Sequence, residues 1–192
     1  MRKKTAILIG FSVLGLLDSV LSYGLPLNFQ YTGFSILWHW YLIGLLVFVR
    51  DKPILLRFLI SSLAAIAYGM LFGSGSLFIW VSFVGLAVLI GFFQNWMNNH
   101  TRQFLVYLLM VTVFDLFSYL WMRSAGAIGV SFFFWLYRME AVTIFVSAIC
   151  IVTVMFADNV MVRFFLIQRH LERKHEKKLL AKMQAQKATE YL

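Results

Sequence analysis

The sequence predicts an all-α polytopic membrane protein, a compact bundle of six transmembrane helices with a basic cytoplasmic C-terminal helix. Its 192 residues are 61% hydrophobic and 13% charged, with a mean hydropathy of +0.82. A typical soluble domain has about 25% charged residues. Apolar runs of membrane-spanning length alternate with short polar breaks, and the basic residues gather at every second break. These three observations exclude an ordinary soluble domain.

The apolar runs cover residues 5–23, 35–49, 54–73, 76–95, 103–122 and 132–157. The first run follows a basic start, as in a signal peptide, but Asp18 interrupts it and no clear cleavage pattern follows. We therefore expect a retained first span. The second run is short, and the uncharged stretch "YGLPLNFQYTGF" before it could dip into the interface. The break "GSGS" is short enough to predict a tight hairpin between the third and fourth spans.

The charges at the breaks predict the orientation. If the N-terminus is cytoplasmic, 15 of the 17 basic residues lie on the inner side, and six spans place both termini inside. Adding or removing one span would scatter these residues over both sides. We expect a multi-pass protein with both termini in the cytoplasm, with a transmembrane domain over residues 1–162 and a basic tail over 163–192.

The tail is polar and helix-favouring, and most of its charge is basic. A net charge of +9 could indicate nucleic-acid binding, but the basic residues follow the inner edge of the membrane. Attraction to anionic lipids explains this pattern more simply, so we expect no nucleic-acid partner. The alternative is a docking helix for a cytoplasmic partner such as a membrane-associated filament.

Four ionisable residues interrupt the apolar spans: Asp18, Asp115, Arg138 and Glu140. Such residues are costly in a bilayer and usually face the protein interior. From the helical rise, all four should lie at a similar depth, about 8–12 Å below the outer surface. We therefore expect Asp18, Asp115 and Arg138 to form a structural charge cluster inside the membrane.

Arg138 and Glu140 are two residues apart in "FFFWLYRMEAVTIF", so a helix turns them to different sides. We predict that Arg138 pairs with Asp115 or with Asp18. Glu140 could be protonated, could meet a polar side chain such as Ser118 or Tyr119, or could face another protein. This last possibility makes Glu140 our candidate for a partner contact.

Three interpretations of this charge cluster remain open. It could be a polar clasp that fixes the packing of the first, fifth and sixth spans, which is the interpretation we favour. It could be a proton or ion relay, although its charges all lie in one half of the membrane. It could also line an outward pocket that His39 joins, although an interfacial position between two tryptophans is the simpler interpretation of His39.

Catalytic and metal-binding patterns are absent from the sequence. It contains no HExxH, GxSxG or phosphate-binding glycine loop, and its histidines and carboxylates lack metal-ligand spacing. The single cysteine, Cys150, lies in an apolar run and excludes an intrachain disulfide. We therefore expect neither an enzyme nor a bound metal or cofactor.

The order of these features resembles the MreD family of rod shape-determining membrane proteins. The resemblance rests on an acidic residue late in the first span ("GLLDSVLS"), a glycine-bearing third span with a tight turn ("AIAYGMLFGSG") and an arginine early in the last span ("FFFWLYRMEAVTIF"). It covers most of residues 5–166. It implies a non-catalytic scaffold that binds MreC and wall-synthesis proteins and links peptidoglycan synthesis to the MreB cytoskeleton for cell-shape control.

The resemblance also implies a fold similar to the S-components of energy-coupling-factor vitamin transporters. These substrate-binding subunits supply the alternative function. They present small residues on an early span to their transducing partner. Gly10 and Gly15 in the first span do not have that spacing, whereas small residues of the third span partly do: Ala64, Ala65, Ala67 and Gly69. For the scaffold, the resemblance also implies that the basic tail could bind MreB. We therefore expect the scaffold function.

Overall fold

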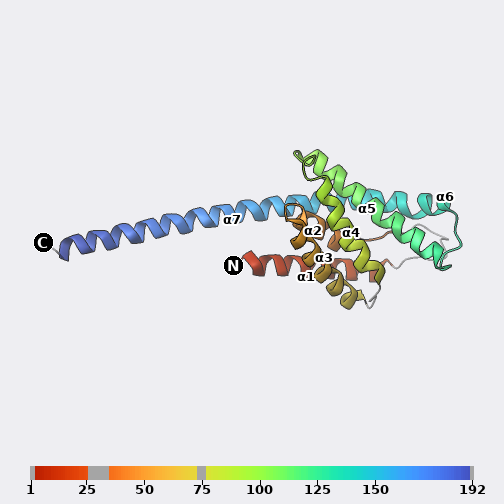
Figure 1. Ribbon diagram of the computed structural model, residues 1–192, viewed down its shortest axis with the longest axis horizontal. Coiled ribbons are helices and arrows are strands. Elements are labelled where there is room, and N and C mark those ends of the chain that lie inside the picture. Colours follow the sequence, from red (N-terminus) through yellow and green to blue (C-terminus); the bar gives the residue numbers. More distant parts are fainter. Residues whose placement is uncertain (1–2, 26–34, 73–76, 191–192) are drawn as a thin grey trace. The chain divides into compact units, whose positions relative to one another are not determined.

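The computed structural model describes residues 3–25, 35–72 and 77–190, and these residues form helices and no β-strand (Figure 1). In chain order, the elements are α1 (Lys3–Gly24), α2 (Trp40–Val49), α3 (Ile54–Phe72), α4 (Leu77–Phe92), α5 (His100–Ser124), α6 (Phe132–Trp135), the π-helical turn η1 (Leu136–Glu140) and α7 (Ala141–Glu190). The predicted all-α class is confirmed for the described part of the chain.

Four helical stretches in the described ranges are long and apolar enough to cross a membrane. They are Thr5–Gly24, Ile54–Phe72, His100–Ser124 and Phe132–Lys174. They match the first, third, fifth and sixth predicted runs. Apolar side chains cover much of their outer surface, and Leu8, Leu63 and Phe145 are more than two-thirds exposed. The chain is therefore a membrane-embedded protein, because such a surface requires a lipid environment.

The second and fourth predicted runs form shorter apolar helices of 10 and 16 residues. At 1.5 Å per residue, α2 is about 15 Å long, half of a bilayer core of about 30 Å. The predicted second span, 35–49, is helical only from Trp40 onward, and residues 35–39 are not helical. The predicted "GSGS" hairpin turn and most of the stretch before the second span lie outside the described residues.

The chain divides into two compact units, residues 1–155 and residues 156–192. The boundary falls seven residues before the predicted boundary at 162/163. The second unit contains the continuation of α7. There Arg163, Arg169, Arg173 and Lys174 are exposed, together with apolar side chains such as Phe164 and Ile167.

The core of the first unit is built around α2. This helix packs against α1, α3, α4 and α5, and each of its residues from Tyr41 to Val47 is buried. Gly44 permits close approach of α1, because a Cβ atom at this position would overlap the side chain of Leu14. The unpaired N–H and carbonyl groups at the two ends of α2 would be costly to bury without hydrogen-bond partners. The side chains that supply these partners form the polar sites of the fold.

Candidate functional site: the polar groups at the two ends of α2

The segment before α2, residues 35–39, is not helical, and other elements supply acceptors for its backbone N–H groups. The Ser35 backbone N–H donates to the Arg138 carbonyl oxygen at 3.4 Å, and the Leu37 N–H donates to Thr143 Oγ1 at 3.2 Å. Non-helical backbone at membrane depth is tolerated where protein groups satisfy it. The π-helical turn η1 supplies one of these acceptors, and π-turns often occur at functional sites.

Asp18 of α1 caps the N-terminus of α2. One carboxylate oxygen accepts a hydrogen bond from the Trp40 N–H and the other from the Tyr41 N–H, both at 2.9 Å. The Asp18 side chain is almost completely buried. A carboxylate at this position satisfies two of the free N–H groups of the first turn and complements the positive end of the helix dipole.

His39 is the last residue before α2 and pairs with Asp115 of α5. His39 Nε2 lies 3.0 Å from Asp115 Oδ1, and both side chains are at most 3% exposed. The other ring nitrogen, Nδ1, lies 3.3 Å from Ser147 Oγ of α7. The ring of Phe114 meets the imidazole edge-on with the ring centroids 5.7 Å apart. His39 therefore joins the start of α2 to two of the long helices.

Glu140, the last residue of η1, is completely buried. Its carboxylate interacts electrostatically with Asp115, and neither of its oxygens has a hydrogen-bond partner among the described residues. The expected partners Ser118 and Tyr119 donate their hydroxyl hydrogens to backbone carbonyls instead. The complete burial corrects our expectation that Glu140 contacts another protein, because no part of this side chain reaches the surface.

The structure places Asp18, His39, Asp115 and Glu140 near the start of α2. A similar depth was predicted for Asp18, Asp115, Arg138 and Glu140, and His39 was not among them. The partners differ from the expected ones. Asp18 binds backbone N–H groups and Asp115 binds His39, where an ion pair with Arg138 was expected. The Arg138 guanidinium lies over the Phe134 ring, 5.5 Å from its centroid, and this side chain is half-buried. His39 is buried rather than interfacial.

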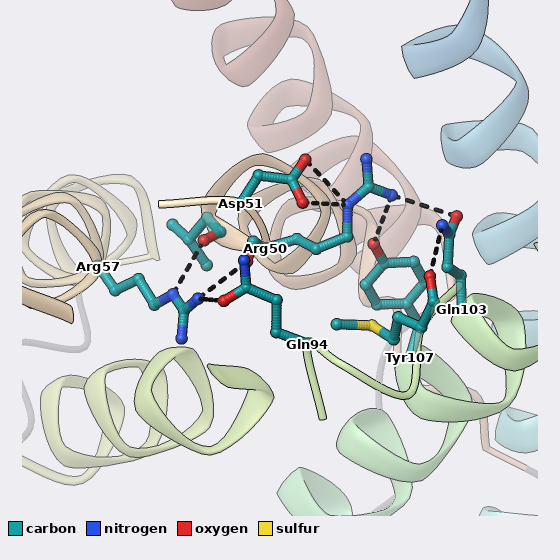
Figure 2. A network of polar contacts seen from close by, with 8 residues as sticks. Arg50, Asp51, Arg57, Gln94, Gln103 and Tyr107 are labelled. Carbon is teal, nitrogen blue, oxygen red and sulfur yellow. Dashed lines mark hydrogen bonds and ion pairs between the residues drawn. The ribbon is translucent and has the colours of Figure 1, made fainter. Parts of the chain in front are cut away.

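Arg57 of α3 caps the opposite end of α2 (Figure 2). Its Nε donates to the Val49 carbonyl oxygen at 3.2 Å, and its Nη2 donates to the Arg50 carbonyl oxygen at 3.0 Å and to Gln94 Oε1 at 2.7 Å. Arg57 is only 6% exposed. It lies so close to Gly91 of α4 that a Cβ atom at Gly91 would overlap Nη1.

Arg50 extends the same network toward α5 (Figure 2). Its Nη1 donates to Gln103 Oε1 and to the Tyr107 hydroxyl, both at 3.2 Å, and its Nε is 3.2 Å from both Asp51 oxygens. Gln103 Nε2 in turn donates to the Met97 carbonyl oxygen at 3.1 Å. Burial disfavours the charged guanidinium, but Tyr107 and Asp51 outweigh this effect and raise the pKa of Arg50.

The two ends of α2 therefore meet opposite charges from neighbouring helices. The carboxylate of Asp18 faces the N–H groups at the start of α2, and the guanidinium of Arg57 faces the carbonyl groups at its end. Each charge has the sign that the helix dipole favours. This arrangement explains how a ten-residue helix persists in the centre of a membrane-embedded bundle.

Arg50 and Arg57 belong to the 15 basic residues that predicted the orientation, and sequence reasoning missed their structural role. The signal that could have found Arg57 is its position inside the apolar run of α3, three residues after the start of the helix. A basic side chain that is buried near the start of a span needs hydrogen-bond acceptors. The C-terminal end of a neighbouring helix supplies them, because its last carbonyl groups are unpaired.

Comparison of the chain with protein-family models, with curated proteins and with solved structures found no match. The functional evidence is therefore the sequence pattern and the geometry described above.

Proposed function

We propose that the chain is a non-catalytic scaffold of the bacterial cell-elongation machinery, of the MreD type. The observation that carries the proposal is the position of Asp18. This residue belongs to the stretch "GLLDSVLS" on which the resemblance rests, and both of its carboxylate oxygens hold the start of the central helix. Asp18 thus joins α1 to α2. A structural role for this residue is what we expect of a scaffold, which presents a fixed surface to its partners.

The proposed scaffold lies in the cytoplasmic membrane with both termini inside and binds MreC and wall-synthesis proteins. The charge pattern of the breaks supports this orientation. The exposed basic residues of the second unit, Arg163, Arg169, Arg173 and Lys174, would then face anionic lipid headgroups or the MreB filament.

Partner identification tests the proposal directly. A tagged full-length chain, expressed from its own locus, is crosslinked in native membranes, purified and analysed by mass spectrometry. A tagged membrane protein of similar abundance serves as the control for nonspecific recovery. Enrichment of a single-span protein with an extracytoplasmic coiled coil, together with wall synthases, supports the scaffold.

The same experiment separates the scaffold from the alternative S-component of a vitamin transporter. An S-component would recover a pair of ATPase subunits and a transducing membrane subunit. Recovery of these proteins in place of wall synthases overturns the proposed function.

A further inference from the structure

The buried carboxylates at the start of α2 outnumber the buried bases beside them. Asp18 from α1 accepts the N–H groups at the start of α2, Asp115 from α5 pairs with His39 of the 35–39 segment, and Glu140 from η1 interacts electrostatically with Asp115. All four side chains are at most 4% exposed. If every carboxylate were ionised, one histidine could neutralise only one of them.

The surroundings of these three carboxylates stabilise the ionised form to different degrees. Asp18 accepts two backbone hydrogen bonds at the positive end of a helix, and these contacts favour its ionised form. Asp115 has His39 at 3.0 Å. Glu140 has no hydrogen-bond donor in the described part of the chain, and the carboxylate of Asp115 acts on it electrostatically.

We propose that Glu140 binds a proton inside the bundle, which makes this cluster a proton-binding site. A buried carboxylate with no donor or cation is strongly disfavoured and becomes neutral instead. The negative charge of Asp115 adds repulsion to the cost of ionising Glu140. The proton resides on Glu140, and Asp115 keeps its negative charge for His39. This inference stands independently of the proposed scaffold function.

The position of the site gives the proton a structural consequence. Glu140 ends the π-helical turn, and the residues one and two turns later on α7, Thr143 and Ser147, contact the segment before α2. Loss of the proton would place two negative charges between α5 and η1. Their repulsion would separate the groups that hold the start of α2, so proton release should loosen this region.

Infrared spectroscopy of the full chain in zwitterionic lipid nanodiscs tests the site. We expect the carbonyl stretch of a protonated carboxylic acid at neutral pH in the wild type, and its loss in Glu140→Gln. Glu172→Gln removes an exposed carboxylate of the second unit and serves as the matched control, in which the band should persist. Absence of the band in the wild type, or an unchanged band in Glu140→Gln, overturns the proposal.

The pH dependence of thermal unfolding gives a second test that is independent of the infrared band. The folded chain should bind this proton more tightly than the unfolded chain, so its stability should fall as the pH rises. In Glu140→Gln this fall should disappear. A wild type that needs Na⁺ rather than choline for stability at neutral pH would indicate a bound metal cation and would overturn the proton assignment.

Discussion

Asp18 and Arg57 hold opposite ends of the same ten-residue helix, although they belong to different helices and lie 39 positions apart in the chain. The carboxylate receives the N–H groups that α2 leaves unpaired at its start, and the guanidinium donates to the carbonyls at its end. The two side chains complete a helix that is too short to span the membrane.

Replacing Asp18 should weaken the joint between α1 and α2. Asp18→Ala leaves two buried N–H groups without an acceptor, and we expect a loss of about 2–4 kcal/mol in the free energy of unfolding. Thermal or denaturant unfolding in detergent measures it. Ser12→Ala changes an exposed position of the same helix and should have little effect. Equal stability of the two variants would contradict the capping role.

Gly91 should be required because it leaves room for the Arg57 guanidinium. Gly91→Ala puts a methyl group into this space, and we expect a cost of about 1–3 kcal/mol in unfolding. Gly85→Ala on the same helix is the matched control, because a Cβ atom there meets nothing within 4 Å. It should be neutral or slightly stabilising.

The destabilising effect of Gly91→Ala should also depend on Arg57. In an Arg57→Ala background the added methyl group no longer meets the guanidinium, so its cost should fall sharply. A double-mutant cycle with unfolding as the readout measures the coupling. Independent, additive effects would show that Gly91 serves some other purpose.

His39 and Asp115 should be coupled in the same way. His39→Ala leaves a buried carboxylate without its base, and we expect a loss of about 3 kcal/mol or more. Adding Asp115→Asn to His39→Ala should recover part of this loss, because the uncompensated charge is removed. Unfolding of the two single variants and the double variant gives the coupling energy. A double variant that is no more stable than His39→Ala would count against the ion pair.

Cysteine labelling should report the predicted orientation. In a Cys150→Ala background, a membrane-impermeant maleimide should label Ser124→Cys in intact cells. It should label Arg102→Cys only after the cells are permeabilised, because Arg102 is expected on the cytoplasmic side. Both positions are exposed in the structure. The opposite labelling pattern would reverse the topology.

The positions of the helices could be predicted from the sequence where the length of an apolar run is enough to define the helix. The first and third runs, 5–23 and 54–73, differ from α1 and α3 by at most two residues at each end. The second run did not become a full helix. In its non-helical first five residues, Ser35 and Leu37 instead donate hydrogen bonds to η1 and α7, and a hydropathy pattern cannot reveal these tertiary contacts.

The gathering of the buried charges could also be predicted, but their partners could not. Depth along the spans indicated that Asp18, Asp115, Arg138 and Glu140 lie at one level. The expectation that Arg138 pairs with an aspartate considered only charged side chains as partners. The N–H groups of Trp40 and Tyr41 compete for Asp18, and such backbone donors become visible only once the start of α2 is known.

The shape of depleted cells tests the central claim most directly. The chain is placed under an inducible promoter in its native host, and the ratio of cell length to width is measured after depletion. The scaffold function predicts that rods become round and that the wild-type chain restores them. Cells that keep their shape after full depletion, and lose uptake of a vitamin instead, would contradict it.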